Sequence, residues 1–108
     1  MIAPEKCGLS EQTQEKLNTV FSKYIQIHKT VLYGSRAKGN FKVGSDIDLT
    51  IFSAEMKITD LLRIQNEIDD LLLPYKVDLS LFHLIDNLAL TEHIERVGVE
   101  FYISTDAQ

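Results

Sequence analysis

The sequence has one cysteine, no long apolar run and no recognisable targeting segment. Cys7 has no partner for an intrachain disulfide and no histidine near it, so neither a disulfide scaffold nor a zinc site is expected. No apolar stretch approaches the roughly 20 residues that span a bilayer, and residues 1–6 lack the apolar part of a signal peptide. We therefore expect a cytoplasmic protein without membrane contact, in which Cys7 is an unimportant thiol near a loose terminus.

Positive charge is also scarce. The 11 lysine and arginine residues are outnumbered by 16 aspartate and glutamate residues, which gives a formal net charge of −5. A broad electrostatic contact with nucleic acid is therefore not expected. The 108 residues, 44% of them hydrophobic, suffice for a single domain over 1–108 that buries a core without a structural metal.

The apolar pattern predicts alternating helices and strands. Ser10 is expected to cap a helix whose apolar stripe contains Leu17, Val20, Phe21 and Tyr24. The other expected elements are strands at 30–33, 46–52, 75–81 and 99–103, a helix that begins at 59–60 and stops at Pro74, and a short helix that begins after Asn87 and ends at a left-handed Gly98. This alternation with short connections predicts an α/β or α+β domain built on a small mixed sheet.

The most specific pattern lies in residues 31–52, VLYGSRAKGNFKVGSDIDLTIF. It contains a buried strand, the turn Gly34-Ser35, a linker with three basic residues, and a second strand with two aspartates. Glycine lets the backbone approach a ligand closely, and N–H groups at a turn that leads into a helix attract anions. A Gly-Ser pair usually only ends a strand, but its position before the two acids favours a phosphate-binding turn.

Asp46 and Asp48 lie two residues apart on the second strand, so their side chains are expected on the same face. Neighbouring carboxylates repel each other unless a cation lies between them, and Mg²⁺ prefers carboxylate and phosphate oxygens. The alternative is a solvent-exposed strand face, but aspartate is depleted in strands, which favours a metal site. Asp78 is the single acid of the strand at 75–81, and it adds a third carboxylate if the two strands pair. By itself it could equally be an exposed acid.

These residues together resemble the signature of the DNA polymerase beta-type nucleotidyltransferase superfamily. The signature comprises Gly34-Ser35, ten intervening residues, Asp46-Ile47-Asp48 and a later strand with Asp78. The short length and the GSRAKG turn are similar to minimal nucleotidyltransferase (MNT) proteins, which are commonly encoded beside a HEPN-domain partner as the antitoxin of a toxin–antitoxin pair. The resemblance covers 31–103 and implies a mixed sheet with helices packed mainly on one face.

The resemblance also implies a reaction, in which AMP is transferred from ATP to an acceptor hydroxyl with release of pyrophosphate. Asp46 and Asp48 would hold two Mg²⁺ ions, and Asp78 would hold the ion that activates the acceptor. Gly34 and Ser35 would position the β- and γ-phosphates. For MNT proteins the implied acceptor is a tyrosine of the HEPN toxin, which AMPylation silences. Two alternatives stay open: transfer to a small molecule such as an aminoglycoside, and a binding antitoxin without catalysis.

The remaining charged residues near the pattern are less informative. Arg36 and Lys38 are predicted either to bind phosphate or to be solvated charges. The histidines have no carboxylate or cysteine at ligand spacing, so surface or boundary positions are expected for His28, His83 and His93. A chain this short offers little surface for a small-molecule acceptor pocket. This favours a heteromeric complex in which a second protein supplies the other wall of the site.

Overall fold

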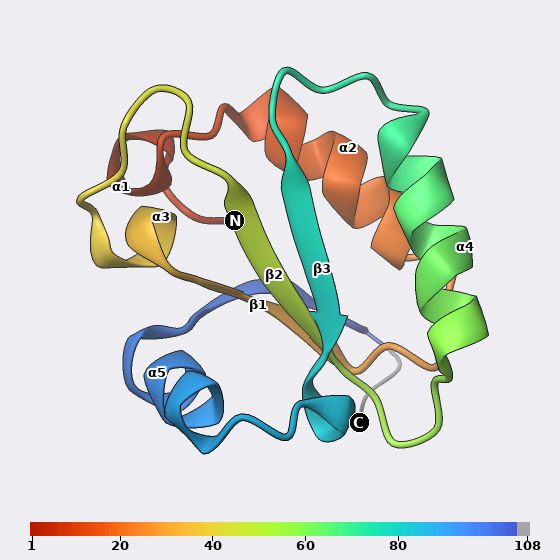
Figure 1. The fold of residues 1–108 in the computed structure, drawn as a ribbon. Helices are drawn as coiled ribbons and strands as arrows, with labels where there is room; N and C mark the ends of the chain where they lie inside the picture. The colour runs from red at the N-terminus through yellow and green to blue at the C-terminus, as the bar shows by residue number, and fades with distance from the viewer. Residues whose placement is uncertain (106–108) are drawn as a thin grey trace.

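The computed structural model describes residues 1–105, which form a four-stranded sheet with helices on both faces (Figure 1). The strands are β1 (Lys29–Tyr33), β2 (Ile47–Phe52), β3 (Val77–Leu81) and β4 (Val99–Ile103). The helices are α1 (Pro4–Cys7), α2 (Glu11–Phe21), α3 (Ser35–Lys38), α4 (Ile58–Asp69) and α5 (Leu88–Val97), with a short 3-10 helix, η1, at Phe82–Leu84. None of the helices in this part of the chain has the length and apolar character needed to cross a bilayer.

The sheet has the strand order β3-β2-β1-β4 and is mixed, as predicted. β1 pairs antiparallel with both β2 and β4, whereas β2 and β3 are parallel. The parallel pair follows from the connection through α4, because parallel neighbours need a crossover long enough to return the chain to the same end of the sheet. The register places Tyr33 beside Asp48 and Asp48 beside Asp78, so these three residues form a row across the sheet.

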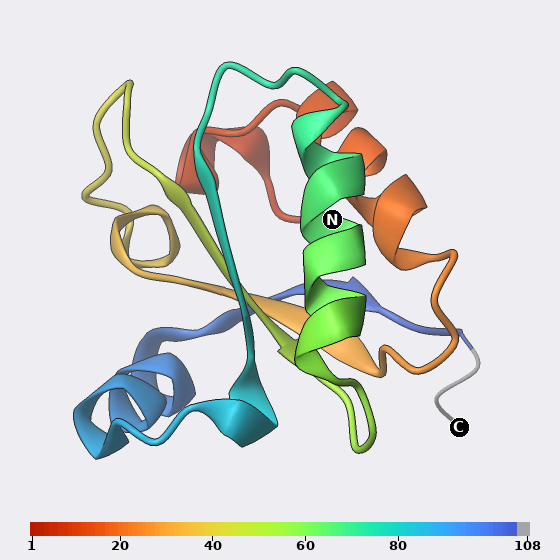
Figure 2. The same cartoon turned by 45° about the vertical axis from the view of Figure 1, so that its right-hand side comes forward.

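One face of the sheet is covered by α2 and α4, which contact each other and lie together in both views (Figures 1 and 2). The predicted stripe of α2 is buried at Leu17, Val20 and Phe21, and Ser10 caps this helix by accepting a hydrogen bond from the Thr13 N–H at 3.1 Å. In α4, Ile64 and Ile68 are buried, and the helix ends at Asp69, before the predicted stop at Pro74. The strands contribute alternate residues to this core, namely Leu32, Ile47, Leu49, Ile51, Val77, Leu79, Leu81 and Phe101. The expectation that helices pack mainly on one face is confirmed.

The opposite face is covered only in part, by α5 and η1. Ile94 of α5 packs on Val31 and Tyr33 of β1, and the rings of Phe52 and Phe82 stack at 4.3 Å between centroids. The strand residues that alternate with the main core lie on this face, and on β2 and β3 they include Asp48 and Asp78. The acids therefore occupy the less covered side of the sheet.

The N-terminus differs from the expected loose segment. Pro4 starts α1, a position that suits proline because its missing N–H is not needed there. Gly8 ends α1 in the left-handed conformation with φ 74°. Cys7 is only 1% exposed and belongs to the main core, so its expected position at an unimportant, loose terminus was wrong.

The end of α5 also differs from the prediction. Gly98 has φ −61° and ψ 142°, which is extended rather than left-handed, because the chain passes directly into β4. Its lack of a side chain serves packing: a Cβ there would lie 2.6 Å from Cγ1 of Val31. Asn87 does cap the helix as expected, and its side chain accepts a hydrogen bond from the Leu90 N–H at 3.2 Å.

Candidate active site

The three candidate metal ligands lie on or next to β2 and β3. Asp48 is half-buried on β2, and its register partner Asp78 is exposed on β3. The two strands therefore do pair, which was the condition for Asp78 to lie near the first two acids. Asp46 is exposed and precedes β2, which begins at Ile47 rather than at residue 46. Two carboxylates thus share one sheet face, and the third lies on the loop that enters it.

Asp48 lies in an unfavourable electrostatic environment. Burial raises the pKa of its carboxyl group, and the negative charges of Asp78 and Asp46 raise it further. The positive charges that His93 and Arg36 can carry act in the opposite direction but do not cancel the rise. The site therefore concentrates negative charge that a bound cation would stabilise.

A metal ion is not held by a ready-made cage here. Within residues 1–105, no three His, Cys, Asp or Glu side chains form a group that could hold one ion without rearrangement. The donor set nevertheless fits Mg²⁺, because carboxylate oxygens are its preferred protein ligands and it keeps several positions for water and phosphate. Two contacts support this fit: Asp48 lies beside Asp78 in the register of β2 and β3, and its carboxylate packs against Gly34.

Gly34 packs directly against one of these acids. Its φ of 74° and ψ of −157° are accessible to glycine but strained for other residues. A Cβ at this position would overlap Oδ2 of Asp48 and would lie 3.3 Å from its Cγ. Glycine is therefore required twice, for its backbone conformation and for the close approach of the Asp48 carboxylate.

Ser35 starts the four-residue helix α3 immediately after this glycine. The carbonyl of Ser35 accepts hydrogen bonds from the N–H groups of Gly39 at 3.0 Å and Asn40 at 3.2 Å, which close the turn. N–H groups in the first turn of a helix have no carbonyl partner within it. The predicted Gly34-Ser35 turn thus lies next to Asp48 and contains donors suited to an anion.

Arg36 is placed differently from either prediction. Its side chain is 1% exposed, and its guanidinium donates hydrogen bonds to three backbone carbonyls, those of Cys7 at 2.9 Å, Gly8 at 3.3 Å and Ser45 at 2.9 Å. A guanidinium committed to these carbonyls is neither a solvated charge nor free to hold a phosphate. Arg36 instead ties α1 to the loop that ends at Asp46.

Two aromatic rings complete the surroundings of this guanidinium. The central carbon of Arg36 lies 5.4 Å from the ring centroid of Phe41 and 4.8 Å from that of Tyr75, within the range of cation–π contacts. The buried charge is therefore hydrogen-bonded and covered by aromatic faces. Lys38, by contrast, is exposed at the end of α3, and its contact with phosphate stays a prediction.

His93 is a site residue that the sequence pattern missed. It lies on α5, and its Nε2 accepts a hydrogen bond from the Gly34 N–H at 3.2 Å. Its ring also meets the Tyr33 ring edge to face, with centroids 6.1 Å apart and planes at 81°. We expected a surface or boundary position for His93, which is consistent with its partial burial, but spacing along the chain gave no sign of its contact with the turn.

Tyr33 lies beside Asp48 in the row across the sheet and extends the polar side of the site. Burial raises the pKa of its hydroxyl, the charges of Asp78 and Asp48 add to the rise, and a hydrogen bond with Ser80 opposes it. The Ser80 hydroxyl in turn donates to the Thr50 hydroxyl at 2.9 Å. The face that holds the acids thus continues into a small network of neutral hydroxyl groups.

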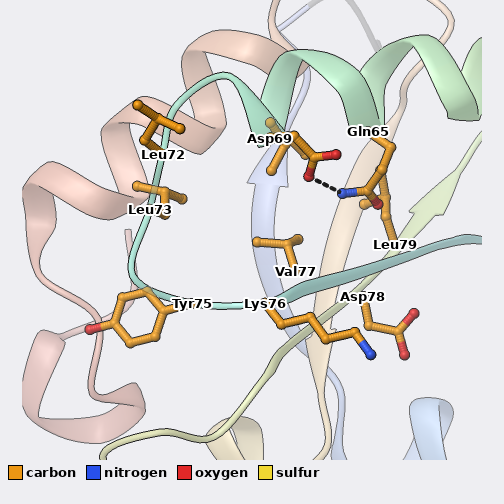
Figure 3. Close-up of a pocket in the computed structure, with 10 residues that line it drawn as sticks. Gln65, Asp69, Leu72, Leu73, Tyr75, Lys76, Val77, Asp78 and Leu79 are labelled. Carbon is orange, nitrogen blue, oxygen red and sulfur yellow. Dashed lines mark hydrogen bonds between the residues drawn. The ribbon is translucent and has the colours of Figure 1, made fainter.

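A cavity of about 510 Å³ borders the site along the edge of β3. It lies between β3 and α4, and its lining includes Gln65, Ile68, Leu72, Leu73, Val77 and Leu79. Figure 3 shows that Asp78 points away from the side on which Val77 and Leu79 lie. The cavity therefore touches the acids only at Asp78, and Asp46 and Asp48 are not part of its lining.

Comparison with known sequences identifies a family. Residues 15–107 match the sequence model of the family described as Polymerase beta, Nucleotidyltransferase. No curated protein sequence matches the chain at a significant level.

Comparison with solved structures shows the same fold in toxin–antitoxin complexes. A chain from a toxin–antitoxin crystal structure with AMP-PNP is 17% identical, with a TM-score of 0.70 over 85% of this chain and 74% of that chain. A chain from the structure of a complex between the tri-AMPylated HEPN toxin of Shewanella oneidensis and MNT antitoxin is 14% identical. Its TM-score is 0.66 over 89% of this chain and 74% of that chain. A chain from the MntA–HepT toxin–antitoxin is 15% identical, with a TM-score of 0.65 over 88% and 74%.

Proposed function

The chain belongs to the polymerase beta nucleotidyltransferase family, and we propose that it transfers AMP from ATP to a tyrosine hydroxyl of a HEPN-domain partner. One observation carries this proposal: the Gly34-Ser35 turn packs against the Asp48 carboxylate, with Asp78 beside it on the next strand. This contact places anion-binding donors next to cation-binding acids, as a metal-bound nucleoside triphosphate requires.

The acids Asp46, Asp48 and Asp78 are the residues proposed to hold Mg²⁺, with two ions expected. Bound Mg²⁺ would neutralise charge on the phosphates and lower the pKa of the attacking hydroxyl. Asp48 lies at the centre of the group, because it is adjacent to both Gly34 and Asp78. Asp46 is exposed on a loop and can adjust its position to a ligand more easily than Asp48 can.

The chain's own task in this reaction is to hold the triphosphate in line with the acceptor. The acceptor oxygen forms a bond to the α-phosphorus as the bond from that phosphorus to the bridging oxygen breaks. Pyrophosphate leaves, and the hydroxyl proton passes to solvent. The Gly34-Ser35 turn is proposed to bind the β- and γ-phosphates, which fixes the leaving group opposite the attacking oxygen.

The proposed acceptor belongs to a second protein, so the working assembly is a hetero-oligomer. Its support is the fold shared with toxin–antitoxin structures, one of which contains an AMPylated HEPN toxin. In this proposal the chain is the antitoxin, and the added AMP silences the toxin. We place the reaction in the cytoplasm, where ATP and Mg²⁺ are available.

Intact-mass spectrometry of the complex tests the proposal. The chain, a HEPN partner and Mg·ATP are incubated together, and the partner is expected to gain one or more AMP units on tyrosine. The double variant Asp46→Asn, Asp48→Asn should abolish the gain while a pull-down still recovers the complex. Asp70→Asn, an exposed aspartate at the end of α4, is the matched control and should leave the gain intact.

The opposite result is equally informative. A partner that binds the chain with Mg·ATP present but gains no mass would overturn the proposed transfer. It would instead favour an antitoxin that acts by occlusion alone.

A further inference from the structure

His93 connects α5 to the proposed phosphate-binding turn across a large gap in sequence. The hydrogen bond from the Gly34 N–H to His93 Nε2 joins residues 59 positions apart. It reaches the one residue of the turn whose backbone is in the positive-φ region. A glycine has more accessible backbone conformations than any other residue, so its neighbours in sequence do little to fix its φ and ψ. A hydrogen-bond acceptor held in place by the tertiary structure can fix them.

The imidazole ring itself is held firmly. Ile94, the next residue of α5, is 2% exposed and packs on Val31 and Tyr33. The His93 ring stands edge to face against Tyr33, which is also buried. The acceptor nitrogen is therefore fixed by the packing of α5 on β1.

The position of Gly34 in turn determines where a metal-binding acid can lie. The Asp48 carboxylate occupies the space that a Cβ of Gly34 would fill. A change in the Gly34 backbone would therefore alter the space open to Asp48 as well as the direction of the neighbouring N–H groups. The contacts form a series, from His93 to Gly34 and from Gly34 to Asp48.

We propose that His93 is a positioning residue that holds Gly34, and through it Asp48, in the arrangement that binds Mg·ATP. The inference rests on the proposed function, because it assigns the turn to the triphosphate. His93 acts as an acceptor at Nε2, which requires the neutral ring with its proton on Nδ1. It touches the turn and not the transferred group, so its effect appears in nucleotide binding.

Three substitutions separate positioning from packing. His93→Gln places a carbonyl oxygen near the former Nε2, whereas the shorter His93→Asn does not reach it and His93→Ala has no acceptor. Calorimetry should show that the Kd for Mg·ATP rises about tenfold in His93→Ala and His93→Asn, as expected for one lost hydrogen bond. His93→Gln should stay within about twofold of wild type. The decisive comparison is between the Gln and Asn variants at equal Tm, because a purely structural role would not separate their affinities.

His83 provides the control on another part of the fold. Its Nε2 lies 3.1 Å from the Met56 carbonyl, on η1 rather than on the turn. His83→Ala should leave the Kd for Mg·ATP unchanged.

A measurement on the wild-type chain keeps the test independent of folding of the variants. Nitrogen-15 NMR should show a scalar coupling across the hydrogen bond, from the Gly34 amide to an unprotonated His93 Nε2. A protonated Nε2 without this coupling would overturn the assignment. So would unchanged or tighter Mg·ATP binding in a folded His93→Ala variant, since tighter binding would mean that His93 competes with phosphate for the Gly34 N–H.

Binding of Mg·ATP to wild-type protein and to the His93 variants distinguishes the proposed function from the role of His93. Wild-type protein that binds no Mg·ATP would overturn the proposed function. Wild-type binding that is indifferent to all three His93 substitutions would overturn only the role of His93.

Discussion

The two faces of the sheet place carboxylates in opposite electrostatic surroundings. On the face covered by α2 and α4, Glu67 accepts a hydrogen bond from the Tyr24 hydroxyl and pairs with Lys23 at 3.1 Å. These partners lower the pKa of Glu67, the Tyr24 bond most of all. On the other face, burial and the charges of Asp78 and Asp46 raise the pKa of Asp48.

The two carboxylates differ in what stabilises their charged form. Glu67 is stabilised in its charged form by its own chain, and it joins α4 to the segment that follows α2. Asp48 is destabilised in its charged form and has acids as neighbours. Groups whose surroundings disfavour their charged form are concentrated at functional sites, where a ligand supplies the missing partner.

The largest effect is expected at Arg36, which joins α1 to the loop that ends at Asp46. Arg36→Met keeps much of the side-chain volume but removes the donors to Cys7, Gly8 and Ser45. Buried carbonyls without partners should lower the free energy of unfolding by about 3 kcal/mol, measured by urea denaturation. Lys38→Met, on the exposed end of the same helix, is the control and should change it by less than about 0.5 kcal/mol. Equal effects would mean that the buried hydrogen bonds contribute little.

The second prediction compares two glycines that both have a positive φ. Gly34 has φ 74° and faces Asp48, whereas Gly39 has φ 85° and a Cβ added to it would meet no heavy atom within 4 Å. Gly39→Ala should cost about 1 kcal/mol from backbone strain alone. Gly34→Ala should cost more, about 2–3 kcal/mol, and should also abolish Mg·ATP binding because the Asp48 carboxylate is displaced. Matching losses of stability and binding in the two variants would contradict the role of the Gly34–Asp48 contact.

The third prediction concerns Glu67 and its partners, on the side of the sheet covered by α2 and α4. Tyr24→Phe removes the hydroxyl that donates to Glu67, and should lower the free energy of unfolding by about 1 kcal/mol at pH 7. Because the folded-state pKa of Glu67 lies below its usual 4.5, this stabilisation is present above that value and is lost as the pH falls through the lowered pKa. Urea titrations at several pH values should therefore show the two proteins converging in acid. A constant difference down to low pH would show that Glu67 ionisation is not involved.

The smallest effect is expected at Asp48, and it has the opposite sign. Its folded-state pKa lies above the usual 3.8, so the folded protein binds the proton more tightly than the unfolded chain does. The contribution of this carboxyl group to the free energy of unfolding is fully present below pH 3.8. It is lost as the pH rises through the raised folded-state pKa. Asp48→Asn should therefore raise Tm slightly at pH 7 in EDTA, while Mg·ATP binding is lost. A fall in Tm at pH 7, with no change for the control Asp70→Asn, would mean that the Asp48 carboxylate stabilises the fold.

Local signals predicted the elements well. The caps at Ser10 and Asn87, the stripe of α2 and the alternation of β2 all depend on residues within a few positions of one another, and the structure contains each of them. The pairing of Asp48 with Asp78 was only a condition of the sequence analysis, and the structure fulfils it through the crossover by α4.

The sequence-based predictions were wrong or incomplete for residues that contact segments distant in sequence. The guanidinium of Arg36 is buried because α1 and the loop before Asp46 both supply carbonyls to it, and neither could be placed from the turn itself. His93 reaches Gly34 only because α5 packs on β1. The predicted left-handed conformation of Gly98 was wrong for a related reason. The short path into β4 and the close approach of Val31 determine its backbone conformation.

The sequence by itself determined the alternation of elements, the shared face of β2 and β3 that holds Asp48 and Asp78, and the membership of the nucleotidyltransferase family. These follow from side-chain period and from residue types at fixed spacing, which act over short distances along the chain. Only the tertiary structure decided which charges are buried, which backbone groups receive a partner and how closely Asp48 approaches Gly34. Burial and close contact depend on segments that are distant in sequence, and their packing determines the electrostatics of the site.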